Sequence, residues 1–311
     1  MNTDFNYSSV ASIIQAAEKN SLPVSALVLS QQAQQMELEE KTVYEKMASN
    51  FQVMKECIEP GCDEHLKSTS GLTGGDAYKL RRYSEKGKSL TGSFLSGALY
   101  RALAVSELNA SMGRIVAAPT AGSCGILPAA LITMQVEKGC SDHDCVMALF
   151  TASAIGMVIA NNASLAGAQG GCQAECGSAA AMAAAAITEL AGGTPHMVSQ
   201  AVAIALKNIL GLVCDPVAGL VEIPCIKRNG IGVGNAFSGC DMALSGVKSF
   251  IPCDEVIDSL YHIQEKLFRS PEFKTLKNTE GIGASWTPTG KSTIQTAQEL
   301  SRDILLPKKQ W

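Results

Sequence analysis

The stretch Ala179-Ala-Ala-Met-Ala-Ala-Ala-Ala-Ile187 decides the fold of this chain. Alanine has the highest helix propensity and a small side chain, so this run predicts a helix that packs closely against its neighbours all round. Similar apolar runs extend outward from it, and we expect helices at 93–112, 127–138, 144–160, 177–191, 196–212 and 234–249. The alternation typical of strands is missing, which predicts a mainly α fold with the chemistry in Gly/Pro-rich loops between helices.

The composition is that of a buried globular protein. Hydrophobic residues make up 46% of the 311 residues and charged residues only 17%, which excludes a disordered chain. A net charge of −4 gives no electrostatic reason to expect nucleic acid or an anionic membrane as a partner. Residues 1–10 lack the features of a signal peptide, and the apolar run 146–160 is shorter than the roughly 20 residues that span a membrane. We therefore expect a cytoplasmic protein with no membrane and no nucleic-acid partner.

The two ends of the chain are more polar than its middle. Residues 1–56 predict two helices, the first capped by Ser8-Ser9 and the second running from Gln31 to Met54 with one charged face. We expect an N-terminal helical arm over residues 1–60 and a larger helical domain over 61–311 that carries the chemistry. The last fifty residues, rich in Lys, Glu and Asp, predict one or two amphipathic helices.

Eleven cysteines indicate a function beyond packing. They are Cys57, Cys62, Cys124, Cys140, Cys145, Cys172, Cys176, Cys214, Cys225, Cys240 and Cys253. Without a secretory signal a disulfide framework is not expected, and clustered thiols in a reducing compartment more often serve metals or catalysis. About seven or eight of the eleven are expected to be small buried hydrophobes.

Two loops are suited to holding an anion. The first loop, Lys67-Ser-Thr-Ser-Gly-Leu-Thr-Gly-Gly-Asp76, offers hydroxyls and glycines that let backbone N–H groups approach a ligand. The second loop, residues 117–128, leads small residues into a predicted helix N-terminus, where a carboxylate or phosphate binds favourably. Neither matches a phosphate-binding loop or a dinucleotide fingerprint, and each is also compatible with a tight turn and a helix cap.

Two further loops carry candidate metal ligands. The third loop spans 167–176 and holds Cys172, and the fourth spans 214–225 and begins and ends with cysteine. The predicted helix pair between them returns the chain to its starting side, so Cys172 and Cys214 can meet, and Cys225 has the freedom to reach back. Lys227 and Arg228 beside it would balance the negative charge of thiolates.

The spacing of these cysteines is compatible with an iron–sulfur cluster but does not by itself decide between the possible metal sites. Zinc sites usually show matched tight pairs, and among the Gly-rich loops only Cys172 and Cys176 form one; the close grouping of a ferredoxin is absent too. Three widely spaced cysteines in Gly- and Pro-rich loops suit a cluster with one iron left open to substrate. Metal and substrate sites are therefore expected in the inter-helix loops.

The four loops together resemble the α chain of the iron–sulfur L-serine dehydratases. The motifs that carry the resemblance are STSGLTGGDA at 68–77, APTAGSCGILPAAL at 118–131, GAQGGCQAECGSAAAMAAAA at 167–186 and CDPVAGLVEIPCIKRN at 214–229, with a weaker echo at Thr287-Pro-Thr-Gly-Lys291. The resemblance runs from roughly residue 67 to 237 and implies a largely helical fold, which agrees with the expectation from composition and periodicity.

The resemblance implies a cofactor and a partner. It implies a [4Fe–4S] cluster on Cys172, Cys214 and Cys225, with Cys176 as a nearby spare and Cys124 as a structural residue. It makes 61–311 a catalytic iron–sulfur domain and implies elimination of water from L-serine to give pyruvate and ammonia without pyridoxal phosphate. The family also has a β part, for which this sequence has no room, so we expect a separate β chain and a hetero-oligomer.

The resemblance also suggests roles for loop residues. The candidates for holding the substrate are Ser68, Thr69, Ser70, Thr73, Thr120, Ser123, Gly167 and Gln169. For the base that removes the Cα proton we expect Lys67 or His65, unless the β chain supplies it. Three rival hypotheses stay open: an iron–sulfur electron-transfer or sensor protein, a related lyase acting on another small amino acid, and a zinc-stabilised helical scaffold.

Overall fold

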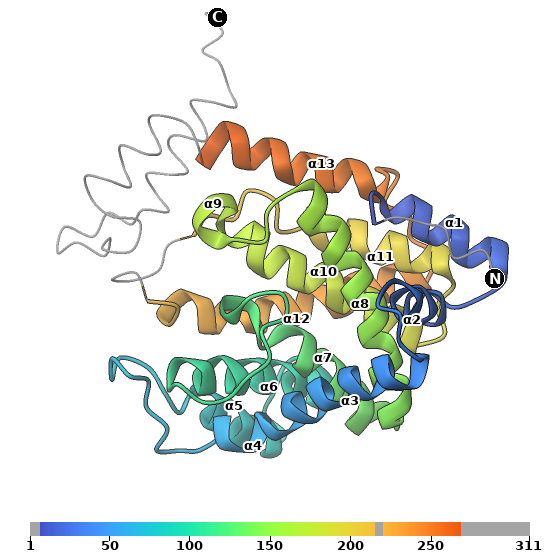
Figure 1. Cartoon of the computed structure of the whole chain (residues 1–311). Coiled ribbons are helices and arrows are strands. Elements are labelled where there is room, and N and C mark those ends of the chain that lie inside the picture. Colours follow the sequence, from blue (N-terminus) through green and yellow to red (C-terminus); the bar gives the residue numbers. More distant parts are fainter. Residues whose placement is uncertain (1–6, 215–219, 269–311) are drawn as a thin grey trace, which may run out of the picture.

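The computed structural model describes residues 7–214 and 220–268 (Figure 1). The helices are α1 (Val10–Asn20), α2 (Val24–Gln35), α3 (Glu40–Glu56), α4 (Ile58–Gly61), α5 (Asp76–Glu85), α6 (Gly92–Ala110), α7 (Ile126–Lys138), α8 (Asp142–Asn162), α9 (Gly167–Cys172), α10 (Ser178–Leu190), α11 (Pro195–Lys207), α12 (Ile223–Leu244) and α13 (Cys253–Ile263). Three short elements complete them: η1 (Ala121–Ser123), η2 (Gln173–Gly177) and η4 (Gln264–Phe268). The described residues contain no strand, and the prediction of a mainly α fold is confirmed.

The alanine-rich helix α10 forms the centre of the core. All residues of the run 179–187 are buried, and eight of the nine are fully so. Figure 1 shows α10 in the middle of the molecule, and it packs against α7, α8, α11 and α12. The small alanine side chains let these four helices approach α10 closely, because little side-chain volume separates the helix backbones.

Local capping signals explain several helix ends. Ser9 accepts a hydrogen bond from the Ser12 amide (3.1 Å) and begins α1, as predicted. Ser141 and Asp144 form a reciprocal capping box at the start of α8. Thr194 accepts from the Met197 amide and precedes Pro195 at the first turn of α11.

Two predicted helix patterns differ from the structure. The N-terminal region has three helices instead of two, because the chain turns between α2 and α3, where Glu37 has a φ of 53°. The run predicted at 234–249 is part of α12, which begins at Ile223 and ends at Leu244. Pro224 and the Gly-rich sequence that follows hid its first turns, although proline is acceptable at the start of a helix.

The N-terminal helices pack on the rest of the molecule. Val10, Ile13 and Leu27 are fully buried. The carboxylate of Asp254 on α13 accepts from the amides of Val10 (2.6 Å) and Ala11 (3.0 Å) and so caps α1 from a distant part of the chain. The division of the chain at residue 60 stays a prediction.

The apolar helix α8 lies inside the protein. By length and composition alone Asp142–Asn162 could cross a membrane, but 67% of its most apolar window is buried in the described structure. A mostly buried helix of this kind is typical of a core, as its sequence predicted. At the other end, α13 buries Val256, Ile257 and Leu260 on one face. It ends at Ile263, so the amphipathic helices predicted for the last fifty residues, like the echo at 287–291, fall almost entirely outside the described residues.

Candidate functional site

The first two turns of α12, residues 223–229, are the meeting point of the four motif loops. The 22-residue helix begins inside the motif 214–229. Its successive side chains point in different directions, because an α-helix has 3.6 residues per turn. Glu222, which precedes the helix, and Lys227 contact two parts of the first loop. Arg228 contacts the third loop, and Asn229 contacts the second loop.

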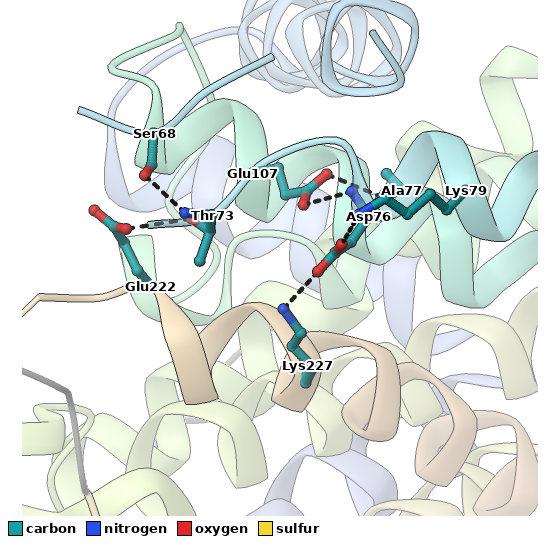
Figure 2. Close-up of polar contacts among 8 residues, drawn as sticks. All are labelled: Ser68, Thr73, Asp76, Ala77, Lys79, Glu107, Glu222 and Lys227. Carbon is teal, nitrogen blue, oxygen red and sulfur yellow. Dashed lines mark hydrogen bonds and ion pairs between the residues drawn. The ribbon is translucent and has the colours of Figure 1, made fainter. Parts of the chain in front are cut away.

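Glu222 holds the first loop. Its carboxylate accepts hydrogen bonds from the hydroxyls of Ser70 (2.7 Å) and Thr73 (3.2 Å), and its side chain is buried, with a residue exposure of 5%. Within the loop, the Ser68 hydroxyl accepts from the Thr73 amide (3.3 Å), as Figure 2 shows. Thr69 turns away and donates to the carbonyl of Ala110 (3.3 Å). A buried carboxylate with two hydroxyl donors fixes the loop against the helix.

A second contact fixes the end of the same loop. The ammonium of Lys227 lies 2.7 Å from the carboxylate of Asp76, the first residue of α5 (Figure 2). Burial opposes the charge of this carboxyl, but hydrogen bonds from Lys227 and Lys79 outweigh it and lower the pKa of Asp76. Glu107 on α6 accepts from the amides of Asp76 (2.9 Å) and Ala77 (3.0 Å), which satisfies donors that a helix start leaves free.

Asn229 holds the second loop. Its side-chain oxygen accepts from the Gly125 amide (2.8 Å), and its amide group donates to the carbonyls of Gly122 and Cys225 (both 2.8 Å). The side chain is fully buried, so these bonds are made without competition from water. A Cβ at Gly125 would collide with the carbonyl oxygen of Ala102, which explains the glycine. Thr120 and Ser123 hydrogen-bond each other in the same loop (3.1 Å).

Arg228 holds the third loop at Cys172. One guanidinium nitrogen donates to the Cys172 sulfur (3.2 Å) and to the carbonyl of Val213 (3.1 Å). The loop bends at Gly171, whose φ of 74° is a backbone conformation that favours glycine. It then passes through the π-helical turn η2 into α10. Gln173 ties the turn to the segment just before the fourth loop, because its amide N–H donates to the Leu212 carbonyl and its side chain accepts from the Gly211 amide.

The predicted ligand cysteines lie around this meeting point. Cys172 and Cys225 are buried, and Cys214 is half-buried. Burial raises the pKa of Cys225, and the negative charges of Cys172 and Cys214 raise it further, so both of these sulfurs lie within electrostatic range of Cys225. A hydrogen bond from Cys176 lowers the pKa of Cys172, and Arg228 adds to this against the effect of burial.

The described residues contain no group of three His, Cys, Asp or Glu side chains close enough to hold a single metal ion. An iron–sulfur cluster presents a different demand, since each thiolate binds a different iron and the sulfurs stand farther apart than the ligands of one ion. The donor set fits such a group in its chemistry: Cys172 and Cys214 are both within electrostatic range of Cys225, two of the three thiols are buried, and the Arg228 guanidinium balances charge. The assignment of Cys172, Cys214 and Cys225 stays a prediction.

Other predicted site residues have their own surroundings. His65 and Lys67 are exposed on the segment between α4 and α5. Gln169 is exposed and accepts from the Ser164 hydroxyl (3.3 Å), whereas Gly167 is buried. A cavity of about 500 Å³ opens beside the site, lined by Cys176, Arg228 and Ile231 together with residues 208–212.

Three side chains of the site escaped the sequence analysis. Glu222 and Asn229 were part of a quoted motif but received no role, because their function as acceptors and donors depends on where α12 begins. Glu175 was likewise quoted without a role. It lies in η2, where Thr120 and the Gly167 amide hydrogen-bond to its carboxylate. A carboxylate or amide inside a Gly-rich motif was the signal that could have identified all three.

Comparisons with known proteins agree with the motifs. A family model described as serine dehydratase alpha chain matches residues 19–274. A probable L-serine dehydratase alpha chain of Bacillus subtilis is 47% identical, over 92% of this chain and 93% of that protein. The L-serine dehydratase alpha chain of Peptoniphilus asaccharolyticus is 40% identical, over 94% and 96%. By contrast, L-serine dehydratase 2 of Escherichia coli is 36% identical over 83% of this chain but only 57% of its own length.

Proposed function

Because the chain belongs to the serine dehydratase alpha chain family, we propose that it is the α subunit of an iron–sulfur L-serine dehydratase. The reaction eliminates water from L-serine and gives pyruvate and ammonia, without pyridoxal phosphate. The observation that carries the proposal is the start of α12, where Arg228 and Asn229 join two motif loops beside Cys172 and Cys225. These contacts support a single site built from the family motifs.

The proposed cofactor is a [4Fe–4S] cluster on Cys172, Cys214 and Cys225. With three protein thiolates, such a cluster supplies one open iron as a Lewis acid for the C3 hydroxyl of the substrate. Arg228 would stabilise the thiolate form of Cys172 through its existing hydrogen bond. Cys176 is buried next to this position and remains a spare thiol in the proposal.

The first two loops would hold the substrate carboxylate. The candidates Ser68, Thr69, Ser70 and Thr73 come from the first loop, and Thr120 and Ser123 from the second. The hydroxyls of Ser70 and Thr73 donate to Glu222, so they orient the loop, and we expect neighbouring loop amides to supply further donors to the carboxylate. Gly167 and Gln169 are not among the residues that line the cavity of about 500 Å³, and in the proposal they would contact the substrate beside Cys172.

The Cα proton must leave to a base. Lys67 and His65 are the candidates on this chain, and the alternative is a residue of a β chain. Both side chains are exposed here, as a base that acts at an interface between subunits would be before assembly. A separate β chain fits the relatives whose names specify an alpha chain.

One experiment tests the proposal directly. The chain is purified anaerobically with and without a co-expressed β chain and assayed for pyruvate from L-serine. We expect a broad absorbance band near roughly 400 nm from iron–thiolate charge transfer, with serine turnover only in the two-chain protein. A coloured protein with reversible redox activity and no turnover would favour the electron-transfer alternative. A colourless protein with stoichiometric zinc would contradict the iron–sulfur assignment.

A further inference from the structure

Glu175 occupies a junction between two of the motif loops. It lies three residues after Cys172 in η2, and its carboxylate is hydrogen-bonded by the Thr120 hydroxyl of the second loop and the Gly167 amide of the third. A Cβ at Gly122 would lie 3.0 Å from a carboxylate oxygen, and one at Gly167 would collide with it. Two glycines therefore let this carboxylate sit against the backbone of both loops.

Among the residues that the structure describes, the carboxylate of Glu175 forms no ion pair. The side chain is half-buried, and burial raises its pKa more than its two hydrogen bonds lower it. A partly desolvated carboxylate without a cation is stabilised by any cation that comes within contact distance.

The other acidic groups around the described part of the site already have partners. Glu222 is buried and accepts two hydroxyls, Asp76 pairs with two lysines, and Glu107 caps α5. L-serine is a zwitterion, so a site that holds its carboxylate with hydroxyls and amides also needs an acceptor for its ammonium. Among the described acidic side chains of these loops, Glu175 is the one that forms no ion pair and is only half-buried.

We propose that Glu175 binds the α-ammonium group of the substrate and thereby makes the site select 2-amino acids over the corresponding hydroxy acids. This inference rests on the proposed function and adds a specificity-determining residue to it. Thr120 is then a positioning residue, because its hydroxyl donates to Glu175 and orients the carboxylate.

The test removes the charge and keeps the hydrogen bonds. In Glu175→Gln the amide oxygen still accepts from Thr120 and Gly167. Binding of two unreactive ligands to the anaerobic two-chain protein is measured by calorimetry: L-alanine, which has the ammonium, and 3-hydroxypropanoate, which lacks it. We expect the dissociation constant of L-alanine to rise at least about tenfold and that of 3-hydroxypropanoate to change by less than about twofold.

Glu189→Gln is the matched control. Glu189 is another carboxylate whose pKa is raised by burial, and it accepts from the Ser25 amide far along the chain from the motif loops. This variant should leave both dissociation constants unchanged. If Glu175→Gln weakens the binding of both ligands equally, its role is purely structural; if neither dissociation constant changes, it has no role in binding. Either result overturns the assignment, while wild-type serine turnover still supports the proposed function. A wild-type two-chain protein without turnover would overturn the proposed function itself, and the assignment with it.

Discussion

Lys227 and Asp76 stand 151 positions apart in the sequence and form an ion pair of 2.7 Å between the start of α12 and the start of α5. The Lys227 side chain is 52% exposed, so solvent screens the pair, and we expect Lys227→Met to lower the free energy of unfolding by less than about 1 kcal/mol. By contrast, Lys227→Met should raise KM for L-serine clearly, because the ion pair sets the position of the first loop. Urea unfolding and substrate saturation measure the two effects. A large loss of stability with an unchanged KM would contradict this separation.

The same pair predicts a pH dependence of stability. The pKa of Asp76 is lower in the folded chain than its ordinary value, so its stabilising contribution is fully present above the unfolded value of about 4 and disappears as the pH falls through the folded value. The difference in unfolding free energy between wild type and Asp76→Asn should therefore shrink below about pH 4. Chemical unfolding of both proteins at several acidic pH values measures it. A difference that stays constant down to about pH 2 would contradict the contribution of this carboxyl.

Asn229 should be far more important for folding than its size suggests. In Asn229→Ala the buried Gly125 amide and the carbonyls of Gly122 and Cys225 lose their partner, which we expect to cost about 2–4 kcal/mol of unfolding free energy. Asn235→Ala is a control on the same helix: Asn235 is half-buried and donates to a single backbone carbonyl, that of Ala205. We expect it to cost about 1 kcal/mol. Equal losses in the two variants would show that Asn229 does not organise the second loop.

The sequence was most informative where a pattern repeats. The run 179–187 predicted the central helix because alanine propensity and uniform burial agree along it, and α10 spans Ser178–Leu190. The boundary of α12 was missed because Pro224 and three nearby glycines resemble a loop in sequence. Only the tertiary contacts of Glu222 and Asn229 show that these residues belong to the start of a helix.

The site was predictable in its parts and not in its arrangement. The motifs named the four loops, yet the loops are joined by hydrogen bonds over more than 100 positions, such as that from the Gly125 amide to Asn229. Such long-range partners leave no periodic trace in a single sequence. That Glu175 forms no ion pair with the described residues was hidden for the same reason, since it depends on which cations lie near it in the fold.

Lys67→Ala and His65→Ala test where the base resides. Both side chains are exposed in this chain, so neither change should alter stability by more than about 0.5 kcal/mol. If one of them removes the Cα proton, its variant should lose about 100-fold or more in kcat while the cluster absorbance stays normal. Single-turnover and steady-state pyruvate assays on the two-chain protein measure this. Near-normal rates in both would remove them as candidates and leave a residue of the β chain as the remaining proposed source of the base.

The three proposed ligand cysteines should differ from the other cysteines in one property: replacing any of them should release iron. Cys172→Ser, Cys214→Ser and Cys225→Ser should each lower the iron content and the absorbance near roughly 400 nm, because a missing thiolate frees one iron. Cys240→Ser is the matched control, since Cys240 is also buried on α12 and its pKa is raised mainly by burial, to about 11. The Cys240 variant should retain iron even if it loses some stability.

Cys176→Ser separates the spare thiol from the ligands. Cys176 hydrogen-bonds to Cys172 and lowers its pKa but is not a proposed ligand, so this variant should keep its iron. Loss of iron from the Cys176 variant together with retention in Cys214→Ser would exchange their roles, and would make the pair 172/176 the anchor of the site.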